Sequence, residues 1–459
     1  MEWKKKTMKV VIIGCGKVGY SISESLTNEG HDVTVIDRNS NALKKIQDSL
    51  DVMCIEGDGA DVEVQLEANV NKAGLLIATT PYDELNILCC LLAKRLGASK
   101  TISRVRNPVY FKQMDLIKDE LRLSMVINPE LITADEIFRV LIFPSAAKLE
   151  VFAKGRVELV EHRLSDNSVL AGMSLAEIYK RYKTKFLICA VQRDSRIFIP
   201  SGDFILHEGD KINVAASHNN LEGFFRTIGS LKDKIKTVMI VGGGKSCHYL
   251  VRQLLGVGMR VKIIENNFEK CRELAETFPK ATIIHGDGTD QELLNEEGIS
   301  DMDAFVSMTG IDEENIIMSL YVKNNSNAKV ITKINRDSYC DLAAQMGLEC
   351  IASPKYLTAS GILSYVRSLK NTAGCNIEAL YHVVGNKAEA IEFKINSRIE
   401  GLVDVPLKDV RLKKNILICG ILRKRDVIIP NGDDCISLGD SVIVISKDYH
   451  FSDIEDILE

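Results

Sequence analysis

The sequence predicts an α/β chain that carries one two-domain module twice, a parallel-sheet domain followed by a small α+β domain. Three observations predict this organisation: strand-like runs alternate with helical stretches, a glycine-rich turn follows the first strand, and both features return about 230 residues later. Residues 10–37 (VVIIGCGKVG to VTVID) return at 238–265 (VMIVGGGKSC to VKIIE), and residues 187–210 return at 417–440. Solenoid repeats are only about 20–50 residues long, so this is a duplicated module. We expect a tandem duplication of four domains, at residues 1–142, 143–230, 231–370 and 371–459.

The first domain alternates continuous apolar runs with stretches of helical periodicity. This pattern is typical of a parallel sheet that is buried on both faces. Pro129 stands near the start of a further helix, where its missing N–H costs nothing. The expected strands are Lys9–Ile13, Asp32–Ile36, Val52–Ile55, Leu75–Ala78 and Thr101–Val105, and the expected helices include Val18–Glu29 and Ser40–Leu50.

The second domain consists of short strand-like runs separated by turns, with one helix. A domain of about 80 residues buries a small core and often leans on a partner surface. The expected strands are Glu158–Leu164, Leu187–Gln192, Arg196–Ile199 and Lys211–Ala215, and the helix is Leu175–Tyr182.

Composition excludes several classes of protein. The chain has 459 residues, 46% of them hydrophobic, and a formal charge of -5, which fits a folded protein and argues against a nucleic-acid binder. Its twelve cysteines are scattered without a C-x-x-C pair, so we expect buried thiols in a reducing compartment and no metal site. The start leaves no room for a signal peptide, and apolar runs such as Leu85–Ala93 are too short to span a bilayer. We therefore expect a soluble cytoplasmic protein.

A glycine-rich turn, Gly14-x-Gly16-x-x-Gly19, joins the first strand to the first helix, and Asp37 ends the next strand. The first glycine permits the tight turn, the second lets a phosphate approach the backbone, and the third lets helix and sheet pack closely. The helix N-terminus near Lys17 offers N–H groups to a pyrophosphate. Asp37 can accept hydrogen bonds from ribose hydroxyls and would repel a 2′-phosphate. The turn therefore predicts a Rossmann-like nucleotide site that favours NAD, ATP or ADP over NADP.

The second copy keeps Gly242 and Gly244 but has Cys247 at the third glycine position and Glu265 in place of the aspartate. The longer acid still reaches a ribose. The cysteine Cβ should push helix and sheet slightly apart, so this site is either remodelled or inactive. The string Gly244-Lys245-Ser246 resembles the end of a Walker A loop, but the glycine that should precede it is missing.

These residues, in this order and duplicated, resemble the RCK (regulator of K⁺ conductance, or KTN) family, and the layout is similar to the peripheral subunits of bacterial Trk potassium-uptake systems. The resemblance covers nearly the whole chain and rests on the GCGKVG turn, Asp37, Gly57-Asp58, Thr79/Thr80 and Arg104, with a trailing β-rich domain. It implies two RCK-N (Rossmann) and two RCK-C domains that bind NAD(H), ATP or ADP. It also implies that four chains form a ring of eight RCK-N domains, docked on the inner face of the membrane to a K⁺-conducting TrkH/TrkG-like subunit.

The resemblance also implies the residues that surround the ligand, with no catalytic residue among them. In the first half they are Gly14, Gly16, Lys17, Val18, Gly19, Asp37, Arg38, Gly57, Asp58, Thr79, Thr80 and Arg104. In the second half they are Gly242, Gly244, Glu265, Asn266, Asp287, Thr309 and Lys333.

Some of these residues also allow a simpler structural interpretation. Arg38 either meets the nucleotide or is solvated, Asp58 and Asp287 either contact the ligand or cap turns, and Thr80 and Thr309 could be ordinary strand-end hydroxyls. Cys189 and Cys419 are expected to be core thiols. The acids Asp83/Glu84 and Asp312/Glu313 are expected to compensate charge at helix N-termini. Because Lys333 replaces arginine and Cys247 replaces glycine, we expect the first site to be the stronger one.

An NAD-dependent dehydrogenase is the main alternative. Ser165, Tyr179 and Lys183 have a spacing similar to that of short-chain dehydrogenases, in which tyrosine is the general acid. The residues fall in the small β-rich domain, and the second copy lacks the constellation, because Asp409 stands in place of the tyrosine beside Lys413. A further alternative keeps the RCK fold but assigns it to another cation channel or antiporter. Binding of cyclic di-AMP to RCK-C stays open.

Overall fold

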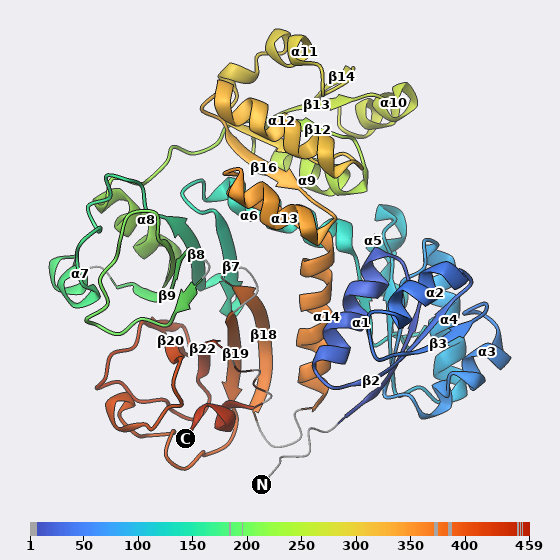
Figure 1. The fold of residues 1–459 in the computed structure, drawn as a ribbon, viewed down its shortest axis with the longest axis horizontal. Coiled ribbons are helices and arrows are strands. Elements are labelled where there is room, and N and C mark those ends of the chain that lie inside the picture. Colours follow the sequence, from blue (N-terminus) through green and yellow to red (C-terminus); the bar gives the residue numbers. More distant parts are fainter. Residues whose placement is uncertain are drawn as a thin grey trace. The chain divides into compact units, whose positions relative to one another are not determined.

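The computed structural model describes residues 7–182, 185–194, 196–370, 375–383, 388–447, 449, 451 and 453–459. Within these residues the strands form four sheets, two parallel and two antiparallel, in the predicted order along the chain (Figure 1). The chain divides into two compact units, residues 1–138 with 236–362 and residues 139–235 with 363–459. One unit therefore holds both parallel sheets and the other holds both antiparallel sheets. The order along the chain did not predict this pairing of like domains.

The first parallel sheet has the strand order β3-β2-β1-β4-β5-β6. The order changes direction between β1 and β4, the place where ligands bind in open α/β sheets. The predicted strands and helices agree with the structure to within three residues at each end; α3, α5 and β6 were not predicted. The elements are β1 (Lys9–Ile13), α1 (Lys17–Asn28), β2 (Asp32–Asp37), α2 (Ser40–Gln47), β3 (Met53–Glu56), α3 (Val62–Glu67), β4 (Leu75–Ala78), α4 (Asp83–Leu96), β5 (Lys100–Arg104), α5 (Pro108–Ile117), β6 (Met125–Ile127) and α6 (Pro129–Ile142).

The second parallel sheet repeats this topology, in the order β14-β13-β12-β15-β16-β17. Its central strand β12 is buried at four of its five positions, as an apolar strand covered on both faces requires. The elements are β12 (Thr237–Val241), α9 (Lys245–Gly256), β13 (Arg260–Glu265), α10 (Phe268–Thr277), β14 (Thr282–His285), α11 (Gln291–Glu296), β15 (Ala304–Ser307), α12 (Asp312–Asn325), β16 (Lys329–Lys333), α13 (Asp337–Gln345), β17 (Cys350–Ala352) and α14 (Pro354–Lys370).

The two antiparallel sheets have the orders β10-β9-β11-β8-β7 and β18-β19-β22-β20-β21. The four predicted strands and α7 are present, and β7 and α8 were not predicted. The elements are β7 (Lys148–Phe152), β8 (Val157–Arg163), α7 (Leu175–Arg181), β9 (Leu187–Arg193), β10 (Arg196–Phe198), β11 (Lys211–Ala216), α8 (His218–Thr227), β18 (Cys375–Val383), β19 (Ala388–Ile395), β20 (Ile416–Arg423), β21 (Asp426–Ile428) and β22 (Ser441–Lys447).

The two antiparallel sheets share a hydrophobic core, as their small size predicts. Phe152 and Cys189 from the first sheet pack in one cluster with Cys419 and Ile443 from the second. Burial and the neighbouring Cys419 thiol raise the pKa of Cys189 well above its ordinary value. Cys189 and Cys419 are both fully buried, as expected for core thiols. Cys54, Cys340 and Cys435 are only partly buried, which the sequence did not predict.

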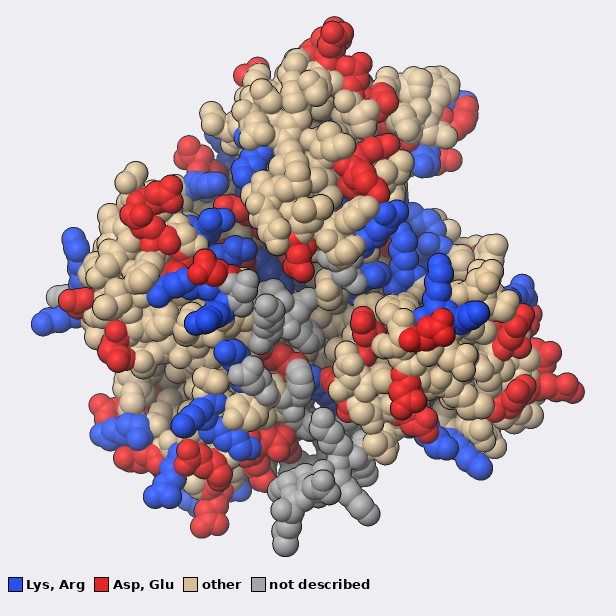
Figure 2. Space-filling model, viewed as in Figure 1, with Lys and Arg blue, Asp and Glu red and all other residues tan. Residues whose placement is uncertain are grey.

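Acidic and basic side chains are interspersed over the visible face of the molecule (Figure 2). This mixture agrees with the small net charge. Among the residues that the structure describes, no helix combines the length and the apolar character needed to cross a membrane.

Candidate nucleotide-binding sites

The first glycine turn lies at the carboxyl end of β1 and has little room for side chains. Gly14 has a φ of +99°, and a Cβ on Gly19 would lie 1.9 Å from the Gly14 carbonyl oxygen. Gly16 has no atom within 4 Å of the position of a Cβ, and it is exposed at the start of α1. Lys17 is exposed on the same first turn, and Val18 is partly buried. The turn thus closes tightly on the sheet and leaves the backbone at Gly16 open to a ligand.

Asp37, at the end of β2, is tied to this turn. Its carboxylate accepts hydrogen bonds from the Cys15 N–H at 2.5 Å and from the Asn39 N–H at 2.8 Å. A carboxylate has about four acceptor positions, so capacity remains for ribose hydroxyls. The side chain therefore fixes the turn in addition to any contact with a ligand.

Arg38 and Asp58 pair with each other, which the sequence did not predict. The Arg38 guanidinium donates to the Asp58 carboxylate, which also accepts the Ala60 N–H at 3.0 Å. The Ala60 N–H and the Arg38 guanidinium hold the pKa of Asp58 below its ordinary value. Gly57, just before it, has no space for a Cβ, which would lie 2.8 Å from Val64. Asp58 therefore caps a turn, as the simpler interpretation proposed, and orders Arg38 beside the crevice.

The two threonines after β4 form hydrogen bonds within the protein. The Thr79 hydroxyl donates to the Gly14 carbonyl at 3.0 Å, and the Thr80 hydroxyl donates to the Asn86 side-chain oxygen at 2.7 Å. The Asn86 amide donates in turn to the Arg104 carbonyl at 3.0 Å. These hydrogen bonds tie together the carboxyl ends of β1, β4 and β5. Sequence reasoning missed Asn86, although its string Asp-Glu-x-Asn repeats at Asn315.

Arg104 is a buried cation at the end of β5. Its Nη2 donates to the Thr80 carbonyl at 2.6 Å, and its buried Nε has no hydrogen-bond partner among the described residues. Burial and the charge of Arg106 lower the pKa of Arg104 to about 10, so it stays cationic at neutral pH. A buried cation with an unused donor favours a bound anion.

In the second half, the seven expected residues line one cavity of about 440 Å³. Glu265 takes the place of Asp37: its carboxylate accepts the Gly243 N–H at 2.7 Å and the Asn267 N–H at 2.8 Å. Asp287 accepts the Thr289 N–H at 2.9 Å, so it also caps a turn. The volume lies within the range of about 300–1,000 Å³ that is common for small-molecule sites. The residues are Gly242, Gly244, Glu265, Asn266, Asp287, Thr309 and Lys333.

The dihedral angles of the second turn match those of the first, with Cys247 at the third glycine position. Gly242 has a φ of +104° against +99° in the first half, and the residue before the helix has φ and ψ of -74° and -175° against -71° and -174°. In the first half, the Thr79 hydroxyl would lie 3.0 Å from a Cβ on Gly19. In the second half, Met308 stands in place of this threonine. Burial raises the pKa of the Cys247 thiol to about 12, so the thiol is inert. The turn therefore has the same backbone conformation in both halves, and the expected separation of helix and sheet stays a prediction.

Lys333 occupies the place of Arg104 and, with Lys270, is one of two lysines that line the second cavity. Its Nζ lies 3.4 Å from the Thr309 carbonyl oxygen. Burial lowers its pKa from the ordinary 10.5, the charge of Lys17 lowers it further, and Glu130 and Asp312 oppose this shift. Since Lys17 and Glu130 belong to the first sheet domain, side chains from both halves act on this cavity.

Lys333→Met is expected to stabilise the ligand-free chain by about 1 kcal/mol at neutral pH. The folded state has the lower pKa, so it binds fewer protons than the unfolded state between that pKa and 10.5. The cost of the buried charge is therefore complete below the lowered pKa and shrinks as the pH rises through this window. Urea unfolding at neutral pH and at pH 10 should show a stabilisation that is smaller at the higher pH. Lys280→Met, at an exposed position, is the control; a Lys333 variant less stable than the parent at both pH values would contradict the argument.

The dehydrogenase constellation does not form a site. Tyr179 packs in the core of the first antiparallel sheet, where its hydroxyl accepts the Ile188 N–H at 2.8 Å and burial raises its pKa. Ser165 is an exposed turn residue, and Lys183 lies outside the described residues. In the part of the chain that the structure describes, no three His, Cys, Asp or Glu side chains are grouped as metal ligands.

The acids at the start of α4 and α12 position loops rather than only compensating the charge of a helix end. The Asp83 carboxylate accepts the N–H groups of Arg106 and Asn107, at 2.9 and 2.8 Å. The Asp312 carboxylate accepts the N–H groups of Asn335 and Arg336 in the same way. Each acid thereby holds the loop that follows the fifth strand of its sheet.

Two parallel sheets with matching glycine turns and strand-end carboxylates define a duplicated protein with the Rossmann-like nucleotide-binding fold. The family model of the TrkA-N domain matches residues 10–129 and 238–354, and that of the TrkA-C domain matches residues 159–229 and 391–459. The chain belongs to the TrkA family. This confirms the resemblance to RCK proteins with a duplicated layout.

Relatives of known name support the same assignment. The chain is 34% identical to the Trk system potassium uptake protein TrkA homolog 1 of Methanosarcina mazei, over 98% of this chain and 99% of that protein. It is 30% identical to the Trk system potassium uptake protein TrkA of Haemophilus influenzae, over 96% of both chains. The GsuK channel bound to NAD has a similar fold, with a TM-score of 0.63 at 17% identity over 97% of this chain and 78% of that chain.

Proposed function

We propose that this chain is the regulatory, non-catalytic subunit of a potassium-uptake transporter. It binds NAD(H), ATP or ADP in its Rossmann-like domains and alters K⁺ flux through an integral-membrane partner of the TrkH/TrkG type, on the cytoplasmic face of the membrane. The observation that carries the proposal is the second cavity, in which a glycine turn, a strand-end carboxylate and a buried lysine meet. The relatives, named as parts of a potassium-uptake system, supply the transport context.

The ligand pose follows from the chemistry of the residues. The ribose hydroxyls donate to Asp37 or Glu265, and the phosphates lie against the open backbone at Gly16 or Gly244. Asp58 and Arg38 in the first half, and Asn266 and Asp287 in the second, lie toward the adenine. The cations Arg104 and Lys333 face the phosphates or the second moiety of a dinucleotide. An anion at Lys333 would offset the unfavourable charge that Lys17 adds there.

The proposed assembly is a ring of four chains with eight RCK-N domains. Both sheet domains carry large apolar side chains that are exposed on their fourth helices, such as Leu88 at 45% and Ile317 at 64%. Burial of such side chains between neighbouring chains would stabilise a ring. The limits of the four domains at residues 142, 230 and 370 belong to the same proposal.

Calorimetric titration of the purified chain with NAD⁺, NADH, ATP and ADP tests the ligands. We expect at least one of the four to bind, and Glu265→Ala to weaken binding at the second cavity by about tenfold or more, because the ribose loses a charged acceptor. NADP⁺ should bind more weakly than NAD⁺ to the parent chain, since a 2′-phosphate would meet a carboxylate in either half.

Arg260→Gln is a suitable control for this titration. Arg260 is exposed at the amino end of β13, the opposite end of the strand from Glu265. It should bind nucleotides like the parent. If none of the four nucleotides bound at millimolar concentration, the proposed ligands would be wrong.

A further inference from the structure

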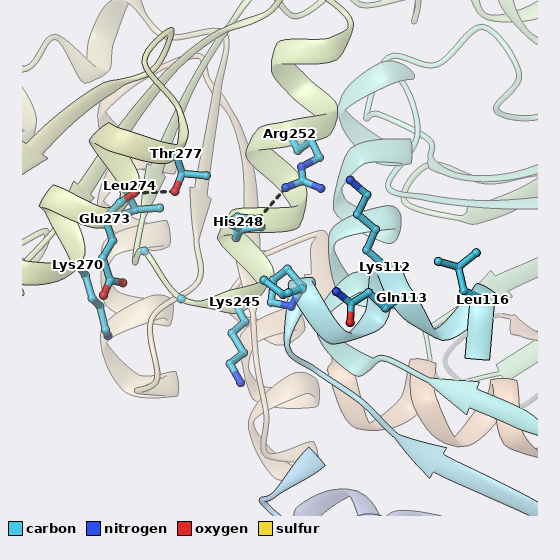
Figure 3. Close-up of a pocket in the computed structure, with 14 residues that line it drawn as sticks. Lys112, Gln113, Leu116, Lys245, His248, Arg252, Lys270, Glu273, Leu274 and Thr277 are labelled. Atoms are coloured by element: carbon cyan, nitrogen blue, oxygen red, sulfur yellow. Dashed lines mark hydrogen bonds between the residues drawn. The ribbon is translucent and has the colours of Figure 1, made fainter. Parts of the chain in front are cut away.

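A further cavity lies in the same compact unit, beside the proposed nucleotide site of the second half. It measures about 740 Å³ and lies between α5 of the first sheet domain and α9 and α10 of the second (Figure 3). It adjoins the glycine turn of the second half, because Gly243, Gly244 and Lys270 line both spaces. We call it the interdomain cavity.

Positive charge dominates this cavity. Lys112, Lys245, Arg252 and Lys270 line it, and Glu273 is the acid among its lining residues. Across the described residues, none of these four cations has a carboxylate within 4.0 Å. Figure 3 shows Lys112 on α5 reaching toward Arg252 on α9. Like charges that face each other in this way favour a bound anion.

His248 orients one of these cations. Its Nε2 lies 3.1 Å from Nη2 of Arg252, one turn further along α9. Since arginine can only donate, the imidazole nitrogen is the acceptor and the ring is neutral. Burial, together with the Arg252 charge, lowers the pKa of His248, in agreement with this arrangement. His248 therefore holds the Arg252 guanidinium in place without cancelling its charge.

We propose that the interdomain cavity binds a phosphate-bearing small molecule, at a site separate from the nucleotide cavities. A phosphate group carries about two negative charges and accepts the forked donors of arginine as well as lysine ammonium groups. The exposed apolar side chains of Val109 and Leu116 on α5 offer a wall to the organic part of such a ligand. This inference goes beyond the proposed nucleotide regulation.

The position of the cavity gives such a ligand a structural consequence. Its cations come from both sheet domains, Lys112 from one and Lys245, Arg252 and Lys270 from the other. An anion that neutralises both sets removes the repulsion between α5 and α9. Binding therefore stabilises the arrangement in which these two helices approach each other.

Titration with inorganic pyrophosphate tests the site, with Glu265→Ala and Lys112→Gln/Arg252→Gln measured beside the parent. A loss of heat in the first variant would report on the nucleotide cavity, whereas a loss in the second reports on the interdomain cavity. We expect the parent chain to bind pyrophosphate. The double variant Lys112→Gln/Arg252→Gln should bind it with an affinity lower by about tenfold or more. The control Lys100→Gln/Arg260→Gln removes the same charges at the amino ends of β5 and β13 and should bind like the parent.

Three results would overturn the inference. The first is no binding of pyrophosphate at millimolar concentration, and the second is equal binding by the two double variants. The third is loss of binding in Glu265→Ala, because the anion would then belong to the nucleotide cavity. ADP binding by Lys112→Gln/Arg252→Gln, measured in the same series and expected to equal that of the parent, shows that the variant is folded and tests the nucleotide proposal independently.

Discussion

Gly19→Ala is expected to destabilise the first sheet domain by about 3 kcal/mol, a large fraction of the stability of a typical domain. The added Cβ would lie 1.9 Å from the Gly14 carbonyl oxygen and 3.0 Å from the Thr79 hydroxyl. The nearest neighbour is a backbone atom in a turn that Gly14 already holds at positive φ. The helix must therefore move away from the sheet. Thermal unfolding followed by circular dichroism should show an earlier transition.

Gly16→Ala is the matched control for this prediction. No atom lies within 4 Å of the position of its Cβ, and its φ of -71° suits any residue. Its stability should equal that of the parent to within about 0.5 kcal/mol, whereas nucleotide binding should weaken because the methyl group occupies the open approach to the backbone. Equal unfolding temperatures for the two alanine variants would refute the steric argument.

The second half suggests a rescue of the Gly19 position. There Cys247 is tolerated next to Met308, where the first half has glycine next to Thr79. Gly19→Cys alone should be destabilising, and the double variant Gly19→Cys/Thr79→Met should recover part of the loss. If the double variant is more stable than Gly19→Cys, the two positions are coupled. If the two variants are equally stable, the turn tolerates or rejects the cysteine regardless of its neighbour.

Local patterns predicted most of the fold because they are set by local physics. A parallel strand buried on both faces must be a short apolar run, so Lys9–Ile13 and Leu75–Ala78 agree with the structure to the residue. The glycine at Gly14 is required by a positive φ, which few other residues adopt. The constant shift of about 230 residues between matching segments predicted the duplication.

Contacts between distant segments could not be predicted in this way. Three features depend on which surfaces meet after folding: the ion pair of Arg38 with Asp58, the hydrogen bonds of Asn86, and the pairing of like domains. The interdomain cavity combines residues more than 100 positions apart, and no motif in the sequence marks it.

Loss of nucleotide control over K⁺ flux is the result expected for the double variant Asp37→Asn/Glu265→Gln, reconstituted in vesicles with its membrane partner. A ligand shifts a conformational equilibrium only by the difference between its affinities for the two states. Each substitution removes the charge that the ribose hydroxyls meet but keeps an oxygen for the turn N–H of Cys15 or Gly243. If each substitution lowers the affinity for the nucleotide about tenfold, each site loses up to about 1.4 kcal/mol of binding free energy. That is the most by which the shift of the conformational equilibrium can shrink at a given nucleotide concentration.

The single variants assign that control to one half or to both. Asp37→Asn alone should abolish the nucleotide response if the first site carries it, as the arginine at Arg104 led us to expect. Glu265→Gln alone should do so if the second cavity carries it, as its seven converging residues suggest. Basal flux should stay near the parent level in all three variants, because the amide oxygen keeps the hydrogen bond from the glycine turn and only the one from Asn39 or Asn267 is lost. A double variant whose flux still follows the nucleotide concentration as in the parent would show that control does not pass through these carboxylates.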